Sequence, residues 1–142
     1  MRLRFILIAA LSALAGLTTS PASAAETKLT VRDSEYGAML WGPGKQAVYV
    51  FSDDDRNRSR CYRRCAAAWP PVLAAHRPQG GHGVSEELLG TIRRRNGDRQ
   101  VTYAGRPLYY YAHEGSGDVE CHDVRLNGGV WWVIGPDGVP RD

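Results

Sequence analysis

A pattern of tyrosine, a second aromatic residue and an acid occurs twice in this chain, and a cysteine follows each copy. The two copies keep one offset of sixty residues at every matched position: Tyr49/Tyr109, Phe51/Tyr111, Asp54/Glu114 and Cys61/Cys121. A period this long is typical of paired supersecondary units and not of a fibrous repeat. The sequence therefore predicts two similar structural units within one chain.

The first 24 residues have the features of a signal peptide. Arg2 and Arg4 supply the positive charge, an apolar run follows them, and the A-x-A sequence that ends at Ala24 offers a cleavage site. The apolar run is shorter than the roughly 20 residues of a membrane-spanning helix. We expect cleavage after Ala24, no membrane span, and a location that is extracellular or in the cell envelope.

Cleavage would leave one domain of ordinary size. The mature chain, 25–142, has 142 − 24 = 118 residues, and it loses two arginines and no acid, so its net charge falls from +3 to +1. A nearly neutral protein has little long-range field to attract nucleic acid, and we expect none as a partner. Its four tryptophans and seven tyrosines suit a small core that is built from rings.

Local patterns predict a mainly β (β-rich α+β) fold. Alternating apolar residues predict strands at 47–51 and 108–112, and Asn96-Gly97 predicts a hairpin with a two-residue turn. Ser59 is the predicted N-cap of a short helix that ends before Pro70. Because the strands pair locally, we expect antiparallel sheets with one or two short helices.

We expect two tandem hairpin-rich repeats, about 28–75 and 88–135, which pack with pseudo-twofold symmetry around one core. The segment 76–84 has no periodicity, and it predicts an exposed linker that is rich in Gly, Pro and His. Tyr49, Phe51, Tyr109 and Tyr111 alternate on strands, so we interpret them as core residues first and as a binding face second. Asp54 and Glu114 then cap turns.

The arrangement of these segments resembles a family of small bacterial secreted proteins, described as predicted lipoproteins or secreted repeats with a Y-x-(F/W/Y)-x-x-D motif. The resemblance spans about 29–134 and rests on the two motifs, Cys61-x3-Cys65 with the following Trp-Pro-Pro, and Gly129-Val-Trp-Trp-Val133. The chain departs from the family pattern in having Glu114 and Cys121 and in lacking a lipidation cysteine. The resemblance implies no agreed biochemical activity.

Three cysteines in an exported chain allow one disulfide and leave one thiol over. The chain-entropy model favours Cys61–Cys121, at roughly 4 kcal/mol against roughly 2 kcal/mol for Cys61–Cys65. Proximity favours the shorter bridge, and so does the resemblance to the family's Cys-x3-Cys pattern. We therefore expect Cys61–Cys65, with Cys121 free, buried or paired between molecules.

Sites for metals and catalysis are weakly indicated. His113, Cys121 and His122 have suitable ligand atoms for zinc or copper, or for a haem-handling protein, but no metal-like spacing joins them. Cys121 and His122 could serve as nucleophile and base, yet adjacent strand residues point apart. We expect no cofactor and no enzymatic activity.

The sequence thus favours an exported, non-enzymatic binding or structural module whose ligand and partner are unknown. The alternative is a metal- or haem-binding exported protein that uses His113, Cys121 and His122. The arginine-rich run 56–64 surrounds Tyr62 and could contact an envelope or extracellular polymer. The simpler interpretation is a solvated face on which these arginines pair with the acids at 53–55.

Overall fold

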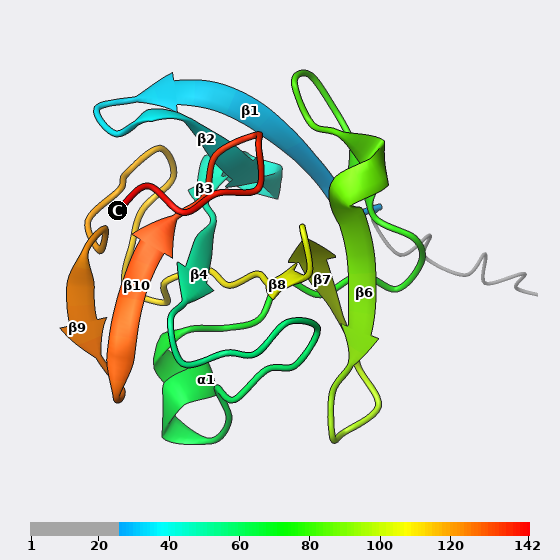
Figure 1. Ribbon diagram of the computed structural model, residues 1–142, viewed down its shortest axis with the longest axis vertical. Coiled ribbons are helices and arrows are strands. Elements are labelled where there is room, and N and C mark those ends of the chain that lie inside the picture. The colour runs from blue at the N-terminus through cyan, green and yellow to red at the C-terminus, as the bar shows by residue number, and fades with distance from the viewer. Residues whose placement is uncertain (1–25) are drawn as a thin grey trace, which may run out of the picture.

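The computed structural model describes residues 26–142, and the predicted signal peptide and cleavage site lie outside them. Ten short strands and one α-helix are formed within these described residues (Figure 1). The strands are β1 (Lys28–Ser34), β2 (Gly37–Gly42), β3 (Gln46–Ala47), β4 (Tyr49–Phe51), β5 (Gln79–Gly80), β6 (Leu89–Arg93), β7 (Arg99–Tyr103), β8 (Arg106–Pro107), β9 (Val124–Leu126) and β10 (Gly129–Val133).

The strands form three small sheets with the orders β3-β2-β1-β5, β6-β7-β8 and β4-β10-β9. All pairs are antiparallel except β1 with β5. In Figure 1, β1 and β2 arch over the molecule, β4 and β10 run side by side, and β6 and β7 stand apart from them. The predicted mainly β fold is confirmed.

The two repeats use equivalent hydrogen bonds. The meander β1-β2-β3 has its counterpart in β6-β7-β8, with the same antiparallel pairing between successive strands. Each repeat also binds a turn of the other. Asn57 N donates to Gly105 O over 2.7 Å, and sixty residues on, Gly117 N donates to Lys45 O over 2.8 Å. Reciprocal contacts at matched positions are what a pseudo-twofold relation requires.

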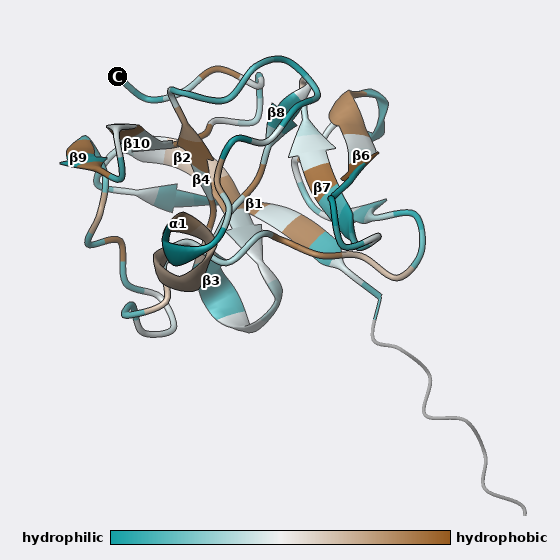
Figure 2. Cartoon of the chain, turned by 90° about the horizontal axis from the view of Figure 1, so that it is seen from below, coloured by the Kyte–Doolittle hydropathy of each residue, from teal (hydrophilic) through white to brown (hydrophobic). Residues whose placement is uncertain are grey.

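The buried side chains form two clusters instead of the single core that we predicted. Because side chains alternate across a strand, β4 sends Tyr49 and Phe51 into one cluster and Val50 into the other. Each cluster contains residues of both repeats. Strands β2 and β4, whose hydrophobic residues are brown in Figure 2, each contribute to both clusters. The first cluster is rich in aromatic rings and cysteine, and the second is mainly aliphatic.

The second repeat lacks the strand predicted at 108–112. Tyr109 forms isolated bridges only, while Tyr110 N donates to Pro70 O over 2.8 Å and Ala112 N donates to Ala68 O over 2.9 Å. The neighbouring segment contains Pro70 and Pro71, which have no N–H to return these hydrogen bonds. The chain is therefore paired there without forming a continuous ladder.

The β6–β7 hairpin turns through three residues and not two. Arg94 N donates to Asp98 O over 2.8 Å, and Gly97 N donates to Arg94 O over 3.0 Å. Only Gly97 has a positive φ, of 91°. The Asn96 side chain accepts Asp98 N over 3.1 Å, and this contact is made with an ordinary negative φ at Asn96. The loop is thus a three-residue hairpin connection that ends in a left-handed glycine.

The predicted Cys61–Cys65 disulfide is present, with Cα atoms 5.2 Å apart. Helix α1 (Arg64–Ala68) is one turn long and begins after Arg63, which has a φ of 55°. The prediction that Ser59 caps the helix is wrong, because the chain reverses at Arg63 and the helix starts beyond the reach of Ser59. Cys61 therefore lies outside the helix, close enough to bridge to its first turn.

The predicted linker is partly ordered into a strand. Its residues Gln79–Gly80 form β5 and pair in parallel with Lys28–Leu29 of β1. Val31 N also donates to His82 O over 2.8 Å. The 3₁₀ turn η2 (Glu86–Leu88) then leads into the second repeat, as η1 (Pro43–Lys45) joins β2 to β3.

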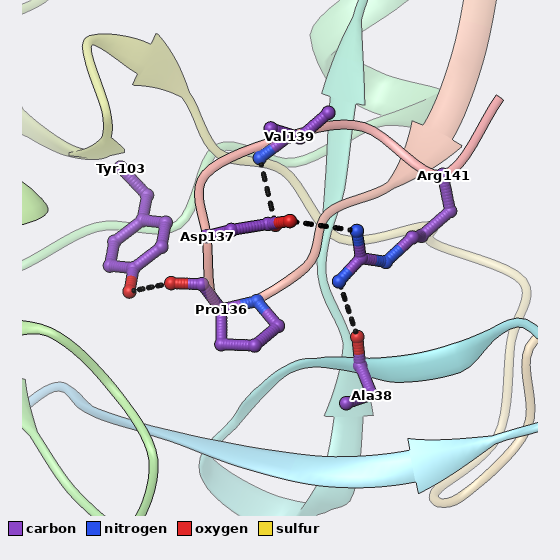
Figure 3. A network of polar contacts seen from close by, with 6 residues as sticks. All are labelled: Ala38, Tyr103, Pro136, Asp137, Val139 and Arg141. Carbon is purple, nitrogen blue, oxygen red and sulfur yellow. Dashed lines mark hydrogen bonds and ion pairs between the residues drawn. The ribbon is translucent and has the colours of Figure 1, made fainter.

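The segment after β10 forms hydrogen bonds with both repeats (Figure 3). Tyr103 Oη, from β7, donates to Pro136 O over 2.8 Å. The Arg141 guanidinium pairs with Asp137 at 3.2 Å and donates to Ala38 O, in β2, over 3.3 Å. The C-terminal turn therefore contacts β7 of the second meander and β2 of the first.

Candidate functional site between the two repeats

The two motif tyrosines lie side by side where the repeats meet. Tyr49 and Tyr109 form an antiparallel bridge in which each N–H donates to the carbonyl of the other, at 2.9 and 3.0 Å. Both residues are fully buried. Because they hold matching places and exchange identical hydrogen bonds, the pseudo-twofold axis passes between them.

Each tyrosine hydroxyl bonds the motif acid of the other repeat. Tyr49 Oη donates to Glu114 Oε1 over 2.5 Å, and Tyr109 Oη donates to Asp54 Oδ2 over 2.7 Å. Each acid also accepts a backbone N–H from six residues further on, at 2.7 Å for Asp54 and 2.5 Å for Glu114. We predicted that each acid caps a short turn. Instead, each acid accepts a hydrogen bond across a six-residue loop of its own repeat and a second one from the tyrosine of the other repeat.

The rings of the motif continue into a stacked column. Trp69 and Trp131 are parallel, with centroids 3.9 Å apart and an interplanar angle of 3°. Phe51 stacks on Trp131 at 4.2 Å, and Tyr111 lies 4.7 Å from Trp69. Each tryptophan therefore contacts a motif ring of the other repeat. Phe51 is buried, whereas Tyr111, at the other end, is half-buried.

A buried arginine supports one of the two tyrosine–acid pairs. Arg94 is 6% exposed, and its Nη1 donates to Gln100 Oε1 over 2.6 Å and to Ser59 Oγ over 3.1 Å. Ser59 Oγ in turn lies 2.7 Å from Tyr109 Oη, which bonds Asp54. The sequence did not reveal this network. Strand β6 ends at Arg93, and the hairpin loop turns the next side chain, that of Arg94, inward.

A cleft opens beside Asp54, between the two repeats. Its volume is about 270 Å³. The first repeat contributes the end of β4 and the acid loop, and the second contributes the β7–β8 turn. The lining residues are Val50, Phe51, Asp54, Asp55, Arg56, Ala104, Gly105, Arg106 and Pro107. The cleft is thus lined by two acidic and two basic residues beside Phe51.

Comparison with known families supports the prediction of two repeats. The sequence profile of a family described as "secreted repeat of unknown function" matches residues 30–73 and again residues 90–134. The chain belongs to this family. Neither the comparison with curated proteins nor the comparison with solved structures gives a match. Within residues 26–142 of this family member, no helix has the length and apolar character needed to cross a bilayer.

In this secreted repeat protein, burial sets the protonation of the motif. It raises the pKa of Asp54 to about 6, even though the N–H of Arg60 and the Tyr109 hydroxyl favour the charged form. Burial likewise raises the pKa of Glu114. The pKa values of both motif tyrosines are raised by burial and by the facing carboxylates, so their hydroxyls stay protonated and act as donors.

The residues predicted as metal ligands do not form a metal-binding group within the described part of the chain. Among residues 26–142, no three His, Cys, Asp or Glu side chains are grouped to hold a metal ion. His113 is exposed, with its ring 5.5 Å from Tyr111. His122 Nδ1 accepts Val133 N over 3.3 Å, and burial lowers the pKa of His122. Cys121 is a buried free thiol whose pKa is raised by burial.

Proposed function

We propose that this secreted repeat protein is a non-enzymatic binding module, located outside the cell or in the envelope, that holds a small ligand between its repeats. The observation that carries the proposal is the cleft beside Asp54, because both repeats line it. A cavity at the junction of two packed units is a common place for a ligand site.

The duplicated motif supplies the scaffold for this cleft. The Tyr49 and Tyr109 hydroxyls fix the acids of the opposite repeats, and the Trp69–Trp131 stack lies in the same buried cluster as the two tyrosines. These contacts hold the walls of the cleft in place before a ligand arrives, which reduces the entropic cost of binding. Of the motif residues, Phe51 and Asp54 also reach the cleft.

The chemistry of the cleft suits a small polar molecule that carries both charges. Asp55 is already paired with Arg60 at 2.7 Å, and the Arg56 guanidinium donates to Ala104 O over 3.2 Å. Arg106 makes no side-chain hydrogen bond or ion pair with any of residues 26–142. Its guanidinium is the natural partner of a ligand carboxylate, and Asp54 that of an ammonium group.

Two features support a role without catalysis. The Cys121 thiol is buried and its pKa is raised, so it carries little of the thiolate that a nucleophile needs. Asp54 and Glu114 are each held by a tyrosine hydroxyl and a backbone N–H. Carboxylates that are held in this way are fixed hydrogen-bond acceptors, which suits binding better than proton transfer.

Nuclear magnetic resonance of the ¹⁵N-labelled mature protein tests the proposal. Glycylglycine, lysine and glutamate serve as zwitterionic probes, and we expect saturable shifts at the amides of Asp55, Gly105 and Arg106. Arg106→Ala should weaken binding at least fivefold. Arg125→Ala, an exposed arginine on β9 that is not part of the cleft, is the matched control and should bind as the parent does.

Shifts that never saturate, or that persist unchanged in Arg106→Ala, would remove the basis for a ligand site between the repeats. Turnover of any probe by the protein would contradict the non-enzymatic part of the proposal. An envelope or extracellular polymer would be a second partner of such a module, and it would bind at a different face of the protein.

A further inference from the structure

Two adjoining hollows lie on the face formed by the end of α1 and the β6–β7 hairpin. Their volumes are about 360 and 470 Å³, and they share Leu73 and Asp98. Tyr62, Arg63 and Arg95 line the first hollow, together with the apolar Ala66 and Pro71. Arg93 and Arg99 line the second. We call the group Tyr62, Arg63, Leu73, Arg93, Arg95 and Arg99 the arginine surface.

Positive charge on the arginine surface is largely uncompensated. Its four arginines are exposed, and the one acid among the lining residues, Asp98, accepts the Asn96 side chain over 2.8 Å. The two ion pairs within residues 26–142 are Arg60–Asp55 and Arg141–Asp137, and neither belongs to this surface. Because the mature chain has a net charge of only +1, this is a local concentration of charge on a nearly neutral protein.

Tyr62 holds the arginine surface in shape. The guanidinium groups of Arg94 and Arg95 lie 4.3 and 4.2 Å from its ring centroid. Arg94 is held in place by buried hydrogen bonds to Ser59 and Gln100 and by a 2.7 Å hydrogen bond from its Nη2 to Cys61 O. The ring and the exposed Arg95 therefore rest on a rigid base, which lowers the entropy lost when a partner binds.

The surface offers apolar as well as cationic contacts. Leu73 is 43% exposed and lines both hollows, and Pro71 and Tyr62 line the first of them. Sugar rings present C–H groups that pack on such side chains, and planar guanidinium groups bind carboxylates in a bidentate way. Two adjoining hollows can accommodate several consecutive sugar units of a polymer, whereas a single small anion would occupy only one of them.

We propose that the arginine surface binds an anionic polysaccharide, a sugar polymer that carries regularly spaced carboxylates. The inference rests on the proposed role as an exported binding module but uses a different face from the cleft beside Asp54. A polysaccharide is favoured over nucleic acid because the near-zero net charge provides little attraction for a densely charged phosphate backbone. The polymer supplies both the charges and the apolar ring faces that the surface accommodates.

Binding of defined oligomers tests this inference. The probes are an octamer of galacturonic acid, a neutral dextran oligomer and a thymidine oligonucleotide of similar length, titrated against the mature protein at several salt concentrations. We expect saturable binding of the galacturonate octamer, weakening with added salt, and at least tenfold weaker binding of the other two. The octamer should shift the amides of Arg95 and Arg99 and leave Gly105 unshifted.

Charge-matched variants decide where the octamer binds. Arg95→Glu with Arg99→Glu should weaken binding at least tenfold. Arg32→Glu with Arg125→Glu makes the same change in net charge at exposed positions outside the surface and should stay within twofold of the parent. Arg95→Gln with Arg99→Gln keeps the test valid if the glutamate pair does not fold.

Equal losses in the two charge-matched pairs would show general electrostatic attraction and overturn the inference. Binding of the oligonucleotide or of dextran as tight as that of the octamer would overturn it as well, as would the absence of saturable binding. Arg106→Ala should leave octamer binding unchanged, so failure of the cleft proposal and failure of this one are separately visible.

Discussion

The hydroxyl of Tyr109 should contribute measurably to stability, and Tyr109→Phe removes it without changing the ring. The hydroxyl makes two hydrogen bonds in a fully buried setting, of 2.7 Å to Asp54 and 2.7 Å to Ser59. A hydrogen bond to a charged group contributes about 1.5–3 kcal/mol, and its loss leaves the partner unsatisfied. We expect the free energy of unfolding to fall by about 2–3 kcal/mol, and Tm to fall by about 10 °C.

The neighbouring tyrosine provides the matched control. Tyr110 also lies in a packed environment, where burial raises its pKa to about 12, but its hydroxyl has no hydrogen-bond partner within residues 26–142. Tyr110→Phe should therefore change the free energy of unfolding by less than about 0.5 kcal/mol. Both variants are measured by urea unfolding, followed through tryptophan fluorescence, at pH 8 and at pH 5.

The pH dependence provides a further check on the assignment of the partner. The Tyr109 hydroxyl favours the charged form of Asp54, so its removal should cost more at pH 8 than at pH 5, where the carboxyl is largely protonated. A double-mutant cycle with Asp54→Asn should give a coupling energy of at least about 1 kcal/mol. Equal losses in Tyr109→Phe and Tyr110→Phe would refute the role assigned to the hydroxyl.

Two other predictions concern the acids and the cysteines. Because the folded-state pKa of Asp54 is about 6 against an ordinary 3.8, the folded state binds a proton more tightly, so its stability should rise as pH falls from about 6 to about 4. The urea midpoint should show this rise, and Asp54→Asn should flatten it. Ellman's reagent should detect one thiol, Cys121, in unreduced protein, and only after unfolding because the thiol is buried. Cys61→Ala with Cys65→Ala should lower the free energy of unfolding by about 2 kcal/mol; three reactive thiols in unreduced parent protein would disprove the bridge.

The repeat architecture was predictable because duplication leaves a mark that does not depend on secondary structure. The constant offset between Tyr49 and Tyr109 identifies equivalent positions directly, and alternation along 47–51 identifies the faces of β4. The same pattern could not show that the opposite face of β4 builds a second cluster. That outcome depends on which surfaces the neighbouring sheets bring to it, and pairing between sheets is not written in local periodicity.

The site was harder to predict than the fold. The crossing of each tyrosine to the acid of the other repeat requires two segments about sixty residues apart to be placed within hydrogen-bond distance. Arg94 stands between two other arginines in the sequence, and only the three-residue hairpin loop turns its side chain inward while its neighbours stay exposed. The cleft beside Asp54 and the arginine surface both arise between segments that sequence reasoning treated separately. Non-local placement is the information that a single sequence lacks.

The reciprocal bridge between Tyr49 and Tyr109 also bears on how such a chain arose. The two backbone bonds of the pair mirror each other, and so do the two tyrosine–acid bonds, as in an isologous homodimer. A gene encoding one repeat could have produced a subunit that met its own copy through the same tyrosine and acid. Fusion of two such genes would make the association intramolecular and independent of dilution, and it would release each half to diverge. The Cys61–Cys65 bridge is confined to the first repeat, whereas the buried Arg94 and the free Cys121 belong to the second.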